Sequence, residues 1–101
     1  MSAFEPCLRL RLFVAGESPD SITAIANLQA LFPDDERPDV EIEIVDVERE
    51  PARAARDRVV VTPTLLKVSP HPTCRILGNL KHGDALLQLL GVGPARRDPG
   101  A

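Results

Sequence analysis

The 101-residue sequence contains no Trp and no Tyr, and its three Phe leave Leu, Ile, Val and Ala to fill the core. It lacks any run of about 18 apolar residues, so no membrane-spanning helix is expected. Its formal net charge of −3 gives no reason to expect nucleic-acid binding. The first residues lack the basic and apolar regions of a signal peptide. We therefore expect one cytoplasmic domain with neither nucleic acid nor a membrane as a partner.

Cysteine is also scarce, and Cys7 and Cys74 form no CxxC motif. Without a secretory signal, both thiols are expected to stay reduced and to behave as small, half-buried apolar groups. A redox pair and a metal site are the alternatives, but His71 and His82 stand at no metal-ligand spacing from either cysteine. We expect no metal and no cofactor.

The first half of the chain predicts a strand, a helix and a second strand. Residues 8–14 alternate Leu with Arg, as expected for a strand with one face in the core. Ser18 is a suitable N-cap for a helix that begins at Pro19 and ends near Phe32. A strand over 40–47 then completes a βαβ unit with parallel strands and a right-handed crossover.

The spacing of apolar residues predicts which positions of these elements face the core. The apolar stripe of the helix is expected to consist of Ile22, Ile25, Leu28 and Phe32. On the second strand, the core-facing positions are expected to be Val40, Ile42 and Ile44. The intervening Glu41 and Glu43 are expected to face water rather than to form a catalytic pair.

The second half is predicted as a helix, two strands and a helix. A short Ala/Arg-rich helix is expected over 51–58. Its basic residues form either a solvated face or a partner-binding patch: Arg53, Arg56 and Arg58. A β-rich segment over 59–68 contains Pro63, which cannot donate to a ladder. A turn at 69–72 precedes a short strand over 73–77.

The last predicted element is a leucine-rich helix over 84–90 that stops at Gly91, with a buried strand as the alternative. We divide the chain into an N-terminal extension (1–7), one domain (8–91) and a disordered tail (92–101).

The order β-α-β-α-β-β-α predicts an α/β, thioredoxin-like fold: a mixed four-stranded sheet with helices on both faces. That fold places a cis-proline just before a strand, and Thr62-Pro63 stands at this place. A redox enzyme of this fold has CxxC between the first strand and the first helix. Here the same position holds Ser18-Pro19-Asp20-Ser21. A hydroxyl forms no disulfide, so dithiol exchange is excluded at this position.

Four pieces of the sequence together resemble the KaiB family. They are FVAG-x-SP-x-S, VDV, TPTL-x-KV-x-P-x-P and RI-x-G-x-L, and the match covers roughly residues 8–90. The resemblance implies a non-enzymatic binding protein that switches between two folds differing in the C-terminal half. It implies that the resting fold self-associates, as a dimer or tetramer, and that the thioredoxin-like fold binds the ring of a KaiC-type ATPase. There it recruits KaiA and competes with the sensor domain of a KaiB-like histidine kinase.

The resemblance carries ring-binding roles to Lys67 and Arg75. The edge strand with Val40, Ile42 and Ile44 is the candidate for pairing with a second partner. Three prolines stand where the family refolds: Pro63, Pro70 and Pro72. Isomerisation there takes tens of seconds or more, which would suit a slow switching step.

This chain departs from the clock-type members at several positions. Thr23 and Asn27 stand where those members carry basic residues, and His71 interrupts a run of prolines. Three hypotheses follow: a KaiC-binding regulator of a circadian or clock-like phosphorylation cycle, a KaiB-like paralogue in stress or signalling without a clock role, and a thioredoxin-like redox protein that uses Cys7 or Cys74.

Overall fold

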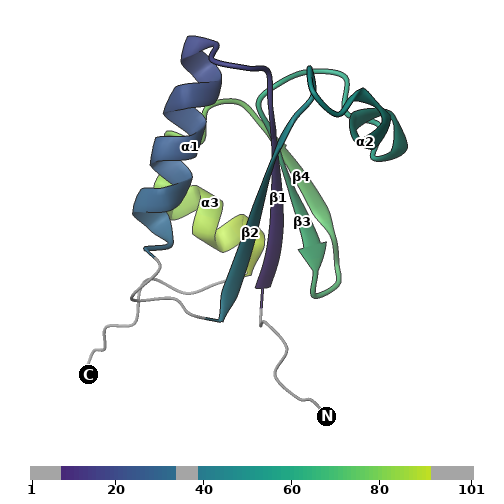
Figure 1. Cartoon of the computed structure of the whole chain (residues 1–101). Helices are drawn as coiled ribbons and strands as arrows, with labels where there is room; N and C mark the ends of the chain where they lie inside the picture. Colours follow the sequence, from purple (N-terminus) through teal and green to yellow (C-terminus); the bar gives the residue numbers. More distant parts are fainter. Residues whose placement is uncertain (1–7, 34–38, 92–101) are drawn as a thin grey trace, which may run out of the picture.

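The structure is a computed structural model that describes residues 8–33 and 39–91 (Figure 1). The elements in chain order are β1 (Leu8–Val14), α1 (Pro19–Leu31), β2 (Val40–Asp46), α2 (Pro51–Arg56), β3 (Thr64–Ser69), β4 (Cys74–Leu77) and α3 (Gly83–Leu90). The predicted N-terminal extension, the tail and Cys7 lie outside the described residues.

The strands form one mixed sheet in the order β2-β1-β3-β4. β1 and β2 are parallel, whereas β3 is antiparallel to both β1 and β4. Helices α1 and α3 cover one face of this sheet, and α2 lies on the other face near one end (Figure 1). The predicted parallel βαβ unit and the mixed sheet with helices on both faces are confirmed.

The larger core lies between the sheet and helices α1 and α3. The even-numbered residues of β1 are buried there, as their alternation with Arg9 and Arg11 predicted. They pack with the buried Leu28 of α1, Leu65 of β3 and Leu90 of α3. Leucine thus fills most of this layer, as expected for a chain with so few aromatic residues.

A smaller core lies under α2, on the opposite face of the sheet. Phe13 and Val45 are fully buried side by side on β1 and β2, and Ala54 of α2 covers them. The prediction for β2 was wrong in part. Val40 and Ile42 are half-buried on the α1 side, but Ile44 is 40% exposed and Val45 is the buried residue. β2 is an edge strand with a neighbour on one side only, so its outer positions are poorly covered.

The predicted stripe of α1 also needs correction. Ile22 is 53% exposed, and the buried positions of the helix include Ser21, Ala24 and Leu28. A polar side chain takes the inward place because Ser21 forms hydrogen bonds at the start of the helix, described below.

The second half follows the predicted order with shifted boundaries. α2 ends at Arg56 rather than Arg58, whose φ of 58° lies in the left-handed region. β3 begins at Thr64, directly after Pro63, so the three valines at 59–61 do not take part in the strand pairing. The segment 83–90 is a helix and not a strand, and it ends at Gly91 in the left-handed conformation that suits glycine.

Candidate functional site

The predicted redox position lies at the end of β1, where two serine hydroxyls replace two thiols. Ser18 is the N-cap of α1, and its Oγ accepts a hydrogen bond from Ser21 N at 3.3 Å. Ser18 Oγ also donates to Ser21 Oγ at 2.9 Å. Ser21 Oγ accepts a second hydrogen bond from Ala15 N at 3.0 Å. The pair therefore serves to close the turn between β1 and α1.

This serine pair has the placement of a CxxC motif but not its chemistry. Ser21 is fully buried and already bonded, so its oxygen is shielded from a substrate. Thr62-Pro63 has a cis peptide bond, as predicted. It lies at the same end of the sheet, because Phe13 of β1 pairs with Thr64 of β3. The scaffold of a redox site is thus present without a thiol at its centre.

A carboxylate at the end of β2 holds the same turn. Asp46 Oδ1 accepts hydrogen bonds from Gly16 N at 3.1 Å and from Glu48 N at 2.9 Å. The hydrogen bonds from Glu48 and then Gly16 hold the pKa of Asp46 below its ordinary value. Gly16 has a φ of 53°, and a Cβ there would lie 2.9 Å from Glu48 Oε1. The Glu48 side chain can move away, so the left-handed backbone conformation is what favours glycine at this position.

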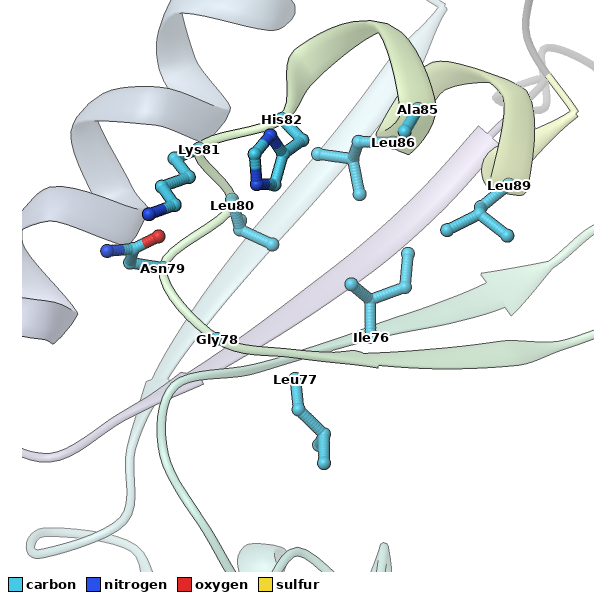
Figure 2. Close-up of a pocket in the computed structure, with 10 residues that line it drawn as sticks. All are labelled: Ile76, Leu77, Gly78, Asn79, Leu80, Lys81, His82, Ala85, Leu86 and Leu89. Atoms are coloured by element: carbon cyan, nitrogen blue, oxygen red, sulfur yellow. The ribbon is translucent and has the colours of Figure 1, made fainter.

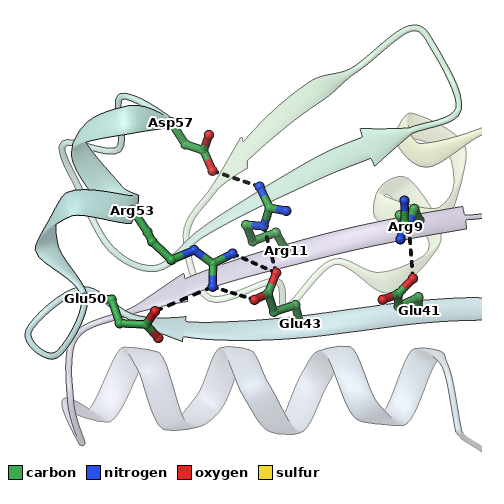
Figure 3. A network of polar contacts seen from close by, with 7 residues as sticks. All are labelled: Arg9, Arg11, Glu41, Glu43, Glu50, Arg53 and Asp57. Carbon is green, nitrogen blue, oxygen red and sulfur yellow. Dashed lines mark hydrogen bonds and ion pairs between the residues drawn. The ribbon is translucent and has the colours of Figure 1, made fainter.

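On the α2 side, arginines and carboxylates form a network (Figure 3). Glu43 accepts two hydrogen bonds from the Arg53 guanidinium, at 2.6 and 2.9 Å, and one from Arg11 Nε at 3.0 Å. Arg11 also pairs with Asp57 at 3.0 Å. Mainly through Arg53, and despite partial burial, the pKa of Glu43 falls from 4.5 to about 2.

This network corrects the prediction that Glu43 faces water, and it takes Arg53 out of the predicted solvated face or partner-binding patch of 51–58. Arg53 is bonded to the sheet, whereas Arg56 and Arg58 are exposed. The sequence contained a usable signal, since Arg9 and Arg11 alternate on β1 as Glu41 and Glu43 do on β2. The parallel register places Arg9 beside Glu41 and Arg11 beside Glu43.

The two residues expected to contact the ATPase ring differ in exposure. Lys67 on β3 is only 6% exposed, and a Cβ built on Gly91 would lie 3.6 Å from its Nζ. Its ammonium group is therefore close to the C-terminal end of α3, where carbonyl groups favour a cation. Arg75 on β4 is exposed. Partner contact by either residue stays a prediction.

The predicted switching positions lie around β3. Pro63 is buried, whereas Pro70 and Pro72 are exposed in the turn between β3 and β4. All three follow cis peptide bonds. Their role in a fold switch stays a prediction.

The described residues offer few other reactive or metal-binding groups. Cys74 is half-buried, and its Sγ lies 3.8 Å from the carbonyl oxygen of Leu89. Residues 8–33 and 39–91 hold no cluster of three or more His, Cys, Asp or Glu side chains suited to a metal ion. Within the same ranges, no helix is long and apolar enough to cross a membrane.

Sequence reasoning missed the surface around β4. The sequence predicts the valine run before Pro63 as part of the β-rich segment 59–68, but Val60 is 91% exposed and Val61 is 47% exposed. With Leu77 they line a hollow on the α2 side of β4. A run of β-branched residues directly before a Thr-Pro was the available signal, because the ladder cannot extend back through proline.

Comparison with known proteins identifies the family. Residues 11–92 match the KaiB domain model. Circadian clock protein KaiB3 from Synechocystis sp. is 38% identical over 85 residues, which cover 84% of this chain and 83% of the relative. Circadian clock oscillator protein KaiB from Microcystis aeruginosa is 33% identical over 87 residues, with 86% and 84% covered.

Solved structures agree on the fold. The N-terminal domain of Synechococcus elongatus SasA superposes with a TM-score of 0.61 at 26% identity, covering 90% of this chain and 89% of that chain. Oxidized mitochondrial thioredoxin 3 from Saccharomyces cerevisiae gives a TM-score of 0.68 at 20% identity, covering 87% and 80%. The chain therefore belongs to the KaiB family and has a thioredoxin-like fold.

Proposed function

We propose that this chain is a non-catalytic regulator that binds a KaiC-type ATPase and modulates its phosphorylation cycle in circadian or clock-like timing. The observation that carries the proposal is the KaiB match over residues 11–92, joined to relatives that are named circadian clock proteins. The serine pair supports a non-catalytic role, because hydroxyls occupy both positions of the redox motif.

The proposal assigns two contacts to the surface. Arg75 is exposed on β4 and is our candidate for contact with the ATPase ring. The exposed edge of β2, with Ile44 40% exposed, is the candidate for strand pairing with a second partner. That partner would be KaiA or a KaiB-like histidine kinase.

The proposal also includes a second, resting fold that self-associates. Sequence patterns were unambiguous up to residue 47 and ambiguous after residue 58, which is where the family refolds. A small domain can hold two packings within a few kcal/mol of each other. If the binding-competent fold were about 1% populated, the apparent affinity for the partner would fall about 100-fold.

Retention of the chain by an immobilised KaiC-type ATPase, with and without ATP, tests the proposal. We expect retention that requires nucleotide and that Arg75→Glu weakens. Arg49→Glu is the matched control, because Arg49 is an exposed arginine outside the predicted patch of residues 53–58. Failure to bind in every nucleotide state, by a folded protein, would contradict the proposal.

A KaiB-like role outside a clock is the second candidate, and one observation favours it. Lys67, which the family resemblance assigns to the ATPase ring, is buried in this fold. This chain would then use a different surface for a different partner. This second role would be supported if the retention assay found no binding to the ATPase while circular dichroism showed that the protein is folded.

A further inference from the structure

β4 is an edge strand whose outer backbone groups face away from the sheet. In the described part of the chain, β4 pairs only with β3. Gly78 N donates a hydrogen bond to Pro63 O at 3.0 Å, so the backbone N–H of Gly78 points toward the β3 side. Backbone groups alternate along a strand, so the N–H and C=O groups of Arg75 and Leu77 point outward. These groups can pair with an added strand.

An apolar hollow lies on each face of the sheet beside this edge. On the α3 side, a hollow of about 350 Å³ is lined by residues that include Ile76, Leu86 and Leu89 (Figure 2). On the α2 side, a hollow of about 370 Å³ is lined by Val60, Val61 and other residues. Figure 2 shows Ile76 and Leu77 pointing to opposite sides of β4. Consecutive side chains of an added strand would point into the two hollows in turn.

Exposed apolar surface is concentrated at this edge. Six large hydrophobic side chains are exposed in the described ranges, and four of them line the two hollows. These four are Val60, Val61, Leu77 and Leu89. Exposed apolar side chains gathered at one edge in this way are typical of a protein-binding site.

The charged groups beside the hollows are basic. Arg58 and Arg75 line one hollow, Lys81 lines the other together with the imidazole of His82, and no acidic residue of the described ranges lines either. Arg75 donates to the backbone carbonyls of Asp57 at 2.7 Å and Arg58 at 3.1 Å. Among the ion pairs of residues 8–33 and 39–91, none involves Arg58, Arg75 or Lys81. The positive charge at this edge is therefore available to a carboxylate from outside.

We propose that the β4 edge binds an extended, acidic segment of a partner protein as a fifth strand. Backbone hydrogen bonds to Arg75 and Leu77 would hold the segment, and its central apolar side chains would enter the two hollows. Its acidic residues would lie near Arg75 and Lys81. This site does not depend on a KaiC-type ATPase, and its test contains none.

The probe is a fluorescein-labelled peptide of sequence EDVIVLDE, titrated against the full chain and followed by amide hydrogen exchange. We expect binding that protects the amides of Arg75 and Leu77 and leaves those of β2 unchanged. The charge-reversed peptide KKVIVLKK should bind at least about tenfold more weakly. Of two peptides that carry N-methyl groups on alternate residues, one should lose binding, because only one set of amides faces β4.

Leu77→Asp tests the apolar anchor and should weaken peptide binding at least about tenfold. Ile22→Asp on α1 is the matched control, since Ile22 is 53% exposed and Leu77 is 59% exposed. It should bind the peptide as the parent chain does. Circular dichroism verifies that both variants are folded.

Three results would overturn the proposal. Protection on β2 instead of β4 would place the peptide at the other edge. Equal binding by both N-methylated peptides would exclude strand pairing. The third result is a chain that binds no peptide but self-associates in sedimentation experiments, with Leu77→Asp abolishing the self-association. The β4 edge would then bind a second copy of this chain.

Discussion

The two edges of the sheet differ in whether their charged side chains form ion pairs. At the β2 edge, Arg9 pairs with Glu41, and Glu43 pairs with Arg11 and Arg53. At the β4 edge, the nearby cations have no carboxylate partner among the described residues, and apolar side chains are exposed. The charged side chains at the β2 edge are therefore paired within the fold, and its backbone edge stays the candidate for strand pairing proposed above. The β4 edge combines cations unpaired in the described ranges with exposed apolar side chains, which is the composition that our proposal of an acidic, extended partner uses.

The difference begins with the strand neighbours. β1 and β2 pair in parallel over seven positions, which places two arginines beside two glutamates on one face. β4 pairs with β3 over four positions, and Arg75 faces the backbone carbonyls of Asp57 and Arg58 instead of a carboxylate. Three predictions test the comparison.

Val45→Ala, near the β2 edge, should destabilise the chain most, by about 2 kcal/mol. The substitution removes two methyl groups from a fully buried position and leaves a cavity beside Phe13. Urea denaturation measures the loss. A loss no larger than that of Leu77→Ala would remove the distinction between the two edges.

Glu43→Gln should lower the free energy of unfolding by about 1 kcal/mol at neutral pH, because it removes the charge that pairs with Arg53. The loss stays this small because solvent screens a side chain that is 42% exposed. The folded-state pKa of about 2 lies below the ordinary 4.5. The unfolded state therefore takes up the proton first as the pH falls. The contribution should be complete above about pH 5 and lost progressively toward pH 2.

Urea midpoints of the parent chain and Glu43→Gln at pH 7 and pH 2.5 measure this effect. The gap between them should narrow in acid and in high salt. A gap that is the same under all of these conditions would contradict the network as the cause.

Leu77→Ala at the β4 edge should have the smallest effect on stability, less than about 0.5 kcal/mol, because the side chain is 59% exposed. The same denaturation series provides the measurement. A loss comparable to that of Val45→Ala would mean that Leu77 belongs to the core, and the β4 edge would then lose its role as a binding surface.

Local patterns predicted most of the fold. The Leu/Arg alternation of β1, the Ser18 cap with Pro19 and the glycine after α3 each depend on neighbouring residues, so they can be read from the sequence. The serine pair at the redox position was predicted in the same way, since both residues lie in one turn.

Features that depend on distant contacts could not be predicted. The exposure of Ile22 and Ile44 depends on how α1 lies over an edge strand, and the burial of Lys67 depends on where α3 ends. The surface beside β4 brings residues 58–61 close to residues 75–77. No pattern among neighbouring residues in the sequence predicts that these two segments lie close together.

The most direct test of a non-catalytic scaffold is turnover of insulin disulfides in the presence of dithiothreitol. The parent chain and Cys7→Ser/Cys74→Ser should have no activity above the uncatalysed rate, because hydroxyls occupy both redox positions. Ser18→Cys/Ser21→Cys should form an intramolecular disulfide, which would verify that these two positions correspond to those of a CxxC motif. Disulfide turnover by the parent chain would contradict the account.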